Sequence, residues 1–269
     1  MTSKFEKVKA SQLLTMKETG KKIVMMTAYD FPTAQILDEA GVDILLVGDS
    51  LGTVIQGHET TLPVTLDQMI YHAEMVTRAA KRAFVVVDMP FPYCQLGPDE
   101  AVRAAARVIK ETGANGVKIE GGQDRIATIS AVIQAGIPVM GHCGLMPQSI
   151  RKLGGYKIQR NPDQLDNDLQ SLQENGVFAA VLECVPKQLS FKMSQKYKIP
   201  LIGIGAGKGC DGQVLVFHDF ALWAAKEPQE LPKHARVYVN LHEIILKAVQ
   251  NFAKDVRSSD FPSDSESFD

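Results

Sequence analysis

The sequence lacks the features that would place it in a membrane or on a nucleic acid. No apolar run in its 269 residues approaches the roughly 18 residues needed to cross a bilayer. The N-terminal stretch MTSKFEKVKA lacks the apolar core of a signal peptide. The formal net charge is only -2, and no basic stripe marks a nucleic-acid surface. We therefore expect a cytoplasmic protein that binds neither membrane nor nucleic acid.

Cysteine is scarce, and its spacing gives no metal or redox motif. The chain has four cysteines, none of them in a Cys-x-x-Cys pair, and no His-x-x-x-His pair that would indicate zinc. In a chain of this length without a signal peptide, we expect reduced thiols that pack as small buried side chains.

Short apolar runs, by contrast, recur along the chain. They are rich in Val, Ile and Leu, are bounded by Gly or Pro, and show little of the alternation typical of half-exposed strands. Such runs are typical of parallel strands that are covered on both faces. The eight predicted strands span residues 22–29, 43–48, 84–89, 116–121, 138–143, 179–184, 200–205 and 213–218.

Segments with helical periodicity separate these runs. The stretch 65–81 has apolar residues at helical spacing, and 98–114 opens with a proline and acids and closes at Gly113. The stretches 123–136 and 163–176 each end on a glycine suited to a helix C-cap. The 206–212 link is too short for a full helix. Eight βα units predict an α/β fold of the (β/α)8 TIM-barrel type, and a doubly wound open sheet is the alternative.

Both ends of the chain carry further signals. The segment 9–20 is predicted to be an N-terminal helix that closes the bottom of the barrel. Residues 240–258 have the pattern of a C-terminal helix, and 259–269 have the composition of a disordered tail. We therefore expect a single catalytic barrel domain over residues 1–258.

Acidic residues stand where predicted strands end. Asp49 follows the second strand, and Asp88, Glu120 and Glu183 lie at the ends of the third, fourth and sixth. Because the carboxyl ends of barrel strands share one mouth, these carboxylates should converge there. The alternation of side chains along a strand predicts that Lys118 points inward with Glu120. Any single acid could instead cap a helix, but four acids and a lysine at one mouth indicate a site.

Converging carboxylates repel one another unless a cation or protons compensate them. Lys118 offsets one charge, and oxygen ligands favour a hard cation such as Mg²⁺, which is usually held by one or two carboxylates and by substrate oxygens. Glu183 has the neighbours Val181, Leu182 and Cys184 and is the candidate general base. His142, near the end of the fifth strand, is either a substrate contact or a core residue.

The stretch GIGAGKGCDG imitates a nucleotide-binding motif. Gly207, Gly209 and Gly212 match G-x-G-x-x-G, but the predicted strand 213–218 follows them where the motif requires a helix N-terminus. A loop at the barrel mouth is the simpler interpretation.

Several motifs, in order, resemble one family. They are MMTAYD, LLVGDSLG, GHETTLPVTLDQMIYH, VVVDMPF, VKIEGG, GHCGLMPQS and GIGAGKGCDGQVLV, and over roughly residues 5 to 255 the chain resembles the ketopantoate hydroxymethyltransferases. Cys143 and Met146 depart from the residues common in the sixth motif, GHCGLMPQS, which are an aliphatic residue and a threonine. Neither position carries the chemistry.

The resemblance implies a one-carbon transferase of pantothenate and coenzyme A synthesis. Its substrates would be 3-methyl-2-oxobutanoate and 5,10-methylenetetrahydrofolate, its metal Mg²⁺, and its assembly a homo-oligomer, typically a decamer. The site residues carried over by motif are Asp49, Asp88 and Glu120 for the metal, Ser50 and Lys118, with the two aspartates, for the oxo acid, and Glu183 as the general base.

Two other functions fit part of this pattern. A lyase or mutase of the isocitrate lyase and phosphoenolpyruvate mutase superfamily would share the acids, but the characteristic loop cysteine of those enzymes is not found here. A non-catalytic barrel that binds an oxo acid or folate would be expected to lose its acids, and all of them are present.

Overall fold

The computed structural model describes residues 6–154, 160–225 and 227–268. The chain divides into two compact units, Met1–Val216 and Phe217–Asp269. The first unit contains all eight strands. The single domain over residues 1–258 and the disordered tail at 259–269 stay predictions.

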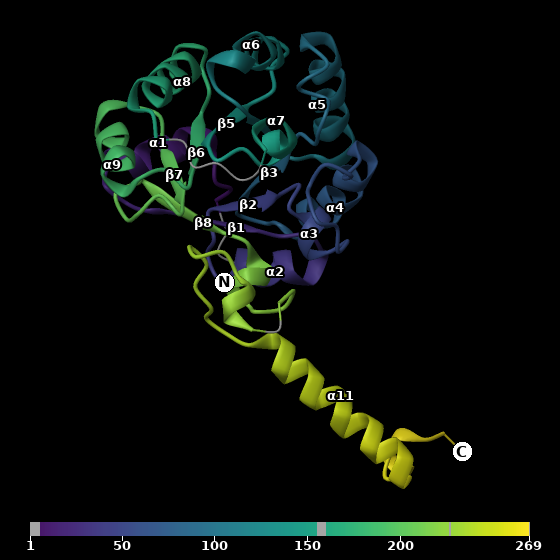
Figure 1. The fold of residues 1–269 in the computed structure, drawn as a ribbon. Helices are drawn as coiled ribbons and strands as arrows, with labels where there is room; N and C mark the ends of the chain where they lie inside the picture. Colours follow the sequence, from purple (N-terminus) through teal and green to yellow (C-terminus); the bar gives the residue numbers. More distant parts are fainter. Residues whose placement is uncertain (1–5, 155–159, 226, 269) are drawn as a thin grey trace. The chain divides into compact units, whose positions relative to one another are not determined.

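Eight parallel strands close into a barrel in chain order, which confirms the predicted fold (Figure 1). The alternative of an open sheet is excluded because the first strand pairs in parallel with the last. The strands are β1 (Ile23–Thr27), β2 (Ile44–Val47), β3 (Phe84–Asp88), β4 (Gly116–Glu120), β5 (Val139–Gly144), β6 (Ala179–Glu183), β7 (Leu201–Ile204) and β8 (Gly212–Leu215).

The last predicted strand, 213–218, extends too far. Strand β8 ends at Leu215, and helix α10 (Phe217–Phe220) follows it. Within that helix the Phe217 and Phe220 rings stack with centroids 6.1 Å apart. A spacing of three residues brings two side chains together on a helix but not on a strand. The stacking of Phe217 on Phe220 therefore favours a helix where the sequence predicts the end of the strand.

The inside of the barrel is filled by side chains that alternate along the strands. Val86 and Val181 are fully or almost fully buried in this cluster, two residues before Asp88 and Glu183 respectively. Because side chains two residues apart share a face, the acids point inward above the apolar layer. The buried cluster consists of Val8, Leu13, Met16, Ile23, Met25, Ile44, Leu46, Phe84, Val86, Met140, Ala179, Val181, Ile202 and Val214.

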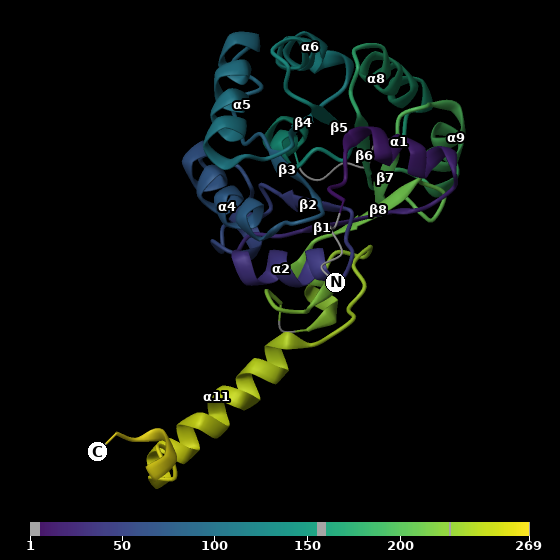
Figure 2. The same ribbon diagram turned by 180° about the vertical axis from the view of Figure 1, so that it is seen from behind.

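Helices surround the strands (Figures 1 and 2). Helix α4 begins with a capping box at Thr65. Helix α5 begins with a proline and ends on Gly113 in the left-handed conformation, as the sequence predicts. Besides the N-terminal helix, the longer helices of this unit are α2 (Phe31–Glu39), α4 (Leu66–Ala79), α5 (Pro98–Thr112), α6 (Ile126–Gln134), α8 (Pro162–Glu174) and α9 (Lys187–Lys196).

Helix α1 (Ala10–Glu18) closes the amino-terminal end of the barrel, as predicted. Leu13 and Met16 join the apolar cluster inside the strands. Lys17 Nζ forms an ion pair of 2.7 Å with Asp211 and donates to the carbonyl oxygen of Ile199, so it ties the helix to the starts of β7 and β8. Figure 2 shows α1 in front of this end of the strands.

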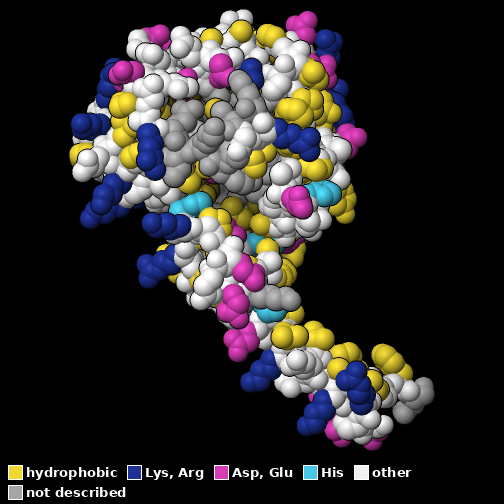
Figure 3. Space-filling view, in the orientation of Figure 1, with side chains coloured by type: hydrophobic (Ala, Val, Ile, Leu, Met, Phe, Trp, Pro, Cys, Tyr) yellow, Lys and Arg dark blue, Asp and Glu magenta, His cyan; other side chains and the backbone are white. Residues whose placement is uncertain are grey.

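The second unit contains α10 and the helix α11 (Leu241–Ser258). Asn240 caps α11 by accepting a hydrogen bond from the backbone of Glu243. One side of α11 carries exposed apolar residues, among them Ile244, Val249 and Phe252 (Figure 3). Among the described residues, no helix is long and apolar enough to cross a membrane.

Candidate active site

Strand register places the predicted residues at one mouth of the barrel. Asp88 on β3 lies beside Lys118 on β4, and Glu120 on β4 lies beside His142 on β5. Glu183 on β6 lies beside Gly144 at the end of β5. Asp49 lies in the turn that follows β2, two residues after the strand ends at Val47. The mouth is therefore built from the carboxyl ends of neighbouring strands, as the sequence predicts.

Asp88 is the centre of the polar contacts at this mouth. Its Oδ1 forms an ion pair with Lys118 Nζ, and its Oδ2 accepts a hydrogen bond of 3.1 Å from the backbone N–H of Asp49. Asp49, Asp88 and Lys118 are all more than nine-tenths buried. Two carboxylates and one ammonium group thus share a small space that bulk water barely reaches.

Gln148 links Glu120 to this group. Gln148 is not among the site residues that the sequence predicts. It lies in the short 3-10 helix η2 (Pro147–Ser149) after β5 and is 8% exposed. Its side-chain amide donates to Asp49 Oδ2 at 3.0 Å and to the carbonyl oxygen of Met89 at 2.9 Å. Its backbone N–H donates to Glu120 Oε1 at 3.1 Å. The signal available in the sequence was the family motif GHCGLMPQS, in which Gln148 is the residue before the serine.

Burial and mutual repulsion perturb the titration of these groups. Burial, with the charge of Asp88, raises the pKa of Asp49 to about 6. Burial, with the charge of Asp49, raises the pKa of Glu120 to about 8. Burial lowers the pKa of Lys118, but the nearby carboxylates, Asp88 first, outweigh it and hold that pKa above its ordinary value. The mouth therefore has an excess of negative charge that one lysine does not balance.

The donor set fits a hard divalent cation of limited protein coordination. Within the described ranges, no group of three or more Asp, Glu, His or Cys side chains is already arranged around a common metal position. The Asp88 carboxylate nevertheless accepts from the Asp49 backbone, and its charge acts on the Asp49 carboxylate. Gln148 donates to Glu120, and Lys118 pairs with Asp88. Mg²⁺ is usually held by one or two carboxylates, with water and substrate oxygens completing its shell. The assignment of Asp49, Asp88 and Glu120 as metal residues stays a prediction.

Ser50 is held beside these acids by a tyrosine. The Tyr29 hydroxyl and the Ser50 Oγ are 2.7 Å apart, and Tyr29 is fully buried. Burial holds the pKa of Tyr29 well above its usual range, so its hydroxyl keeps its proton. Ser50 thus presents a fixed hydroxyl at the mouth, where a substrate carboxylate could accept its hydrogen bond.

Glu183 lies on a different wall of the mouth, against His142. Its Oε2 is 3.2 Å from His142 Nε2, and the glutamate side chain is 19% exposed while the histidine side chain is 4% exposed. The charge of Glu183 also acts on Glu120. His142, left open between substrate contact and core residue, is buried and adjoins the predicted base.

The glycine-rich stretch does not form a nucleotide-binding turn. Strand β8 begins at Gly212, directly where the motif would require a helix. Gly207 has a positive φ of 80°, and a Cβ there would lie 2.6 Å from Cβ of Lys187. The glycine allows the β7–β8 loop to approach α9 closely, which confirms the interpretation as a loop.

Comparison with known proteins identifies the family. A sequence profile of the family described as ketopantoate hydroxymethyltransferase matches residues 7–264. The chain belongs to the ketopantoate hydroxymethyltransferase family. This confirms the resemblance seen in the motifs, and with it the prediction of an enzyme of this transferase family.

Relatives in this family are similar over nearly their full length. A 3-methyl-2-oxobutanoate hydroxymethyltransferase of Rhodopirellula baltica is 50% identical over 257 residues, which cover 96% of this chain and 94% of the relative. One from Flavobacterium johnsoniae is 49% identical over 268 residues, covering 98% and 97% of the two chains.

Solved structures share the fold at low sequence identity. A 2,3-dimethylmalate lyase of the PEP mutase/isocitrate lyase superfamily has a TM-score of 0.61 at 17% identity and covers 93% of this chain and 88% of its own. A phosphonopyruvate hydrolase in complex with oxalate and Mg²⁺ has a TM-score of 0.61 at 13% identity and covers 96% and 92%. At such identities the similarity concerns the barrel alone.

Proposed function

We propose that this chain transfers a hydroxymethyl group from 5,10-methylenetetrahydrofolate to 3-methyl-2-oxobutanoate, giving 2-dehydropantoate and tetrahydrofolate. The observation that carries the proposal is the buried Asp49–Asp88–Lys118 group at the barrel mouth, with Glu183 on a neighbouring wall. In a chain that belongs to the family named for this reaction, that arrangement supports binding of an oxo acid beside a cation and removal of its proton.

The chain's own groups would bind the oxo acid by its two adjacent oxygen functions. Lys118 and the Ser50 hydroxyl are the cationic and hydrogen-bonding partners for the carboxylate. Asp49 and Asp88 would hold Mg²⁺, with Glu120 completing the site. When bound, the metal supplies positive charge beside the keto oxygen and so makes the hydrogen on carbon 3 more acidic.

Glu183 would act as the general base for that hydrogen. Its carboxylate takes the proton from carbon 3, and the electron pair of the broken C–H bond forms the enolate. Carbon 3 then forms a bond to the one-carbon unit, and the two bonds from the one-carbon unit to the folate nitrogens break. Water supplies the hydroxyl oxygen on the one-carbon unit, and the two nitrogens take up one proton from that water and the proton that left carbon 3. His142, 3.2 Å from the Glu183 carboxylate, limits the positions that this carboxylate can take.

The alternative functions have no observation of their own in their favour. The 2,3-dimethylmalate lyase and a phosphoenolpyruvate phosphomutase of similar structure are 17% and 15% identical to this chain, whereas the two hydroxymethyltransferases described above are 49% and 50% identical. A barrel without catalytic activity would not need both a buried carboxylate pair and a separate carboxylate for proton removal. The cytoplasmic location and the decameric assembly stay predictions, and sedimentation velocity would test the second.

The deciding experiment is proton NMR of 3-methyl-2-oxobutanoate in D2O with the protein and Mg²⁺, without folate. We expect exchange of the carbon 3 hydrogen that requires the metal and is lost in Glu183→Gln. The control is Glu174→Gln on α8, an exposed carboxylate that pairs with Gln170 and should exchange normally. Metal-dependent exchange that survives in Glu183→Gln would show that another group is the base.

A further inference from the structure

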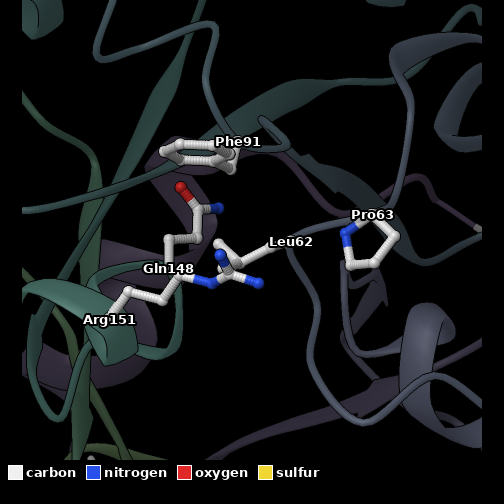
Figure 4. Close-up of a pocket in the computed structure, with 5 residues that line it drawn as sticks. All are labelled: Leu62, Pro63, Phe91, Gln148 and Arg151. Carbon is white, nitrogen blue, oxygen red and sulfur yellow. The ribbon is translucent and has the colours of Figure 1, made fainter. Parts of the chain in front are cut away.

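A pocket opens beside the acid cluster and is not used by the proton transfer described above. Its volume is about 520 Å³, and its lining residues are Leu62, Pro63, Phe91, Gln148 and Arg151 (Figure 4). They come from three segments: the loop before α4, the loop after β3, and the turn that leads from η2 into α7 (Ile150–Leu153). All three segments lie at the carboxyl ends of the strands.

Gln148 belongs both to this pocket and to the acid cluster. The amide that lines the pocket donates to Asp49 Oδ2 at 3.0 Å and to the carbonyl oxygen of Met89 at 2.9 Å. A ligand that contacts Gln148 from the pocket is therefore one side chain away from the carboxylates. The pocket is a second compartment of the same mouth.

The other walls are apolar and suit a flat ring. The Phe91 ring is 37% exposed, and Figure 4 shows it next to the Gln148 amide, with Leu62 and Pro63 across the opening. Aromatic and aliphatic side chains on two sides of a slot provide stacking and van der Waals contact for a conjugated ring system.

Arg151 adds a positive charge that the protein itself does not use. Across the described ranges of the chain, no hydrogen bond or ion pair engages its guanidinium, and the side chain is exposed. In Figure 4 it extends from α7 toward Leu62 and Pro63. A guanidinium with unused donors at the edge of an apolar slot favours a ligand that carries a carboxylate.

The pocket has room for a ligand larger than the small oxo acid. Its volume lies within the range of roughly 300–1,000 Å³ found for pockets that bind drug-sized ligands, whereas the oxo acid has only five carbons. The occupant should be larger, flat at one end and anionic at the other.

We propose that this pocket binds the reduced folate, with its ring system between Phe91 and the Leu62–Pro63 wall and a carboxylate of its glutamyl tail on Arg151. The inference rests on the proposed function, because that function supplies the folate as the one-carbon donor. The assignment also explains why Gln148 contacts both the pocket and Asp49. The reactive end of the one-carbon donor would lie next to the residue that holds Asp49.

The test compares Arg151→Ala and Phe91→Ala with the control Arg103→Ala, whose guanidinium lies 3.8 Å from Glu100 on α5. Binding of tetrahydrofolate is measured by calorimetry, and KM is measured for both substrates. We expect Arg151→Ala to weaken tetrahydrofolate binding and raise the KM for the donor about tenfold, the effect of losing one charge-assisted hydrogen bond. Arg103→Ala should bind as the unmodified protein does.

A second probe separates the tail from the ring. With a tetrahydropterin that lacks the glutamyl tail, Arg151→Ala should bind as well as the unmodified protein, while Phe91→Ala should bind more weakly. If Arg151→Ala weakens both probes equally, the carboxylate contact is wrong. If both variants instead weaken the oxo acid, or if neither weakens tetrahydrofolate, the pocket is not the folate site.

These outcomes are separable from failure of the proposed function. Loss of metal-dependent exchange at carbon 3 in the unmodified protein would overturn the enolisation, whatever tetrahydrofolate does. Normal exchange without any binding of tetrahydrofolate would overturn the pocket assignment while leaving the enolisation in place.

Discussion

The side-chain amide of Gln148 donates a 3.0 Å hydrogen bond to Oδ2 of Asp49, although 99 residues separate the two in the chain. The backbone of the same glutamine donates to both oxygens of Glu120, at 3.1 and 3.3 Å. Gln148 thus positions two carboxylates, that of Asp49 in the turn after β2 and that of Glu120 at the end of β4. Its bond to Asp49 also lowers the pKa of that aspartate, against the larger effects of burial and of Asp88.

Replacing Gln148 with alanine should weaken metal binding more than it weakens the fold. Asp49 would lose the donor that orients it, and residues that orient metal-binding carboxylates typically contribute about 10- to 100-fold to metal affinity. Calorimetric titration with Mg²⁺ in the presence of the oxo acid measures this effect. Gln134→Ala, on the outer helix α6, is the control because that glutamine is exposed and its side-chain amide donates to the hydroxyl of Ser130. Equal Mg²⁺ affinity in both variants would remove Gln148 from the metal site.

The barrel and most of its mouth follow from local patterns that the sequence displays. Apolar runs bounded by Gly and Pro locate the strands, and the period of two along β4 places Lys118 and Glu120 on the inner face. Because barrel strands have a common direction, acids at their ends must meet even when they are far apart in the chain. Asp49, Asp88 and Glu120 could therefore be brought together without any structure.

The contacts that hold these acids could not be predicted in this way. Gln148 lies in an irregular turn, where no periodicity indicates which way a side chain points. The Tyr29–Ser50 contact joins the loops after two different strands, and its geometry depends on both loop conformations. The early end of β8 at Leu215 reflects aromatic packing at helical spacing in the next segment, which an apolar run alone does not reveal.

Replacing Lys118 with methionine should abolish oxo-acid binding and destabilise the protein. The change leaves Asp88 buried without its cation, and breaking a buried ion pair from one side typically costs about 3–5 kcal/mol. It also removes the ammonium group proposed for the substrate carboxylate. Calorimetry should show at least a hundredfold weaker oxo-acid binding, and urea unfolding should show the loss of stability.

Lys17→Met is the matched control for this change. Lys17 makes a partly buried ion pair of 2.7 Å with Asp211 at the opposite end of the barrel. Its loss should reduce the free energy of unfolding to a similar extent while oxo-acid affinity stays normal at a temperature where both variants are folded. If both variants lose oxo-acid affinity equally, the effect of Lys118 is one of stability and not of substrate contact.

The metal-free protein should become less stable as the pH rises from about 4.5 to about 8. Burial, reinforced by the charge of Asp49, raises the pKa of Glu120 to about 8 in the folded state, whereas an unfolded glutamate titrates near its ordinary value of about 4.3. Below the pKa of the unfolded state, Glu120 is protonated in both states, and its contribution to the free energy of unfolding is fully present. Between the two values the folded state binds more protons, so stability falls with rising pH.

Thermal unfolding in a chelating buffer across this pH range tests the effect. Glu120→Gln cannot titrate but keeps an oxygen that can accept the hydrogen bond from the Gln148 backbone. The melting temperature of this variant should therefore fall less steeply with pH than that of the unmodified protein. Identical pH slopes would show that Glu120 does not carry a raised pKa in the folded state.

Replacing Gly48 with alanine should impair substrate binding by displacing the Ser50 hydroxyl. A Cβ at Gly48 would lie 2.7 Å from Ser50 Oγ and 3.5 Å from Asp88 Oδ2. Gly48 is not in the left-handed conformation, so an alanine backbone fits and the conflict is confined to these side chains. Because the Ser50 Oγ must move, its 2.7 Å contact with Tyr29 is lost and the hydroxyl no longer faces the proposed carboxylate position. We expect a KM for the oxo acid raised about tenfold, the effect of one lost hydrogen bond to a charged group.

Gly52→Ala is the control, because its Cβ would lie 2.6 Å from Val64 Cγ2 and so crowds a neighbouring position without touching Ser50. An equal rise of KM in both variants would attribute the effect to the loop as a whole, whereas a rise in Gly48→Ala alone, reproduced by Ser50→Ala, assigns it to the Ser50 hydroxyl.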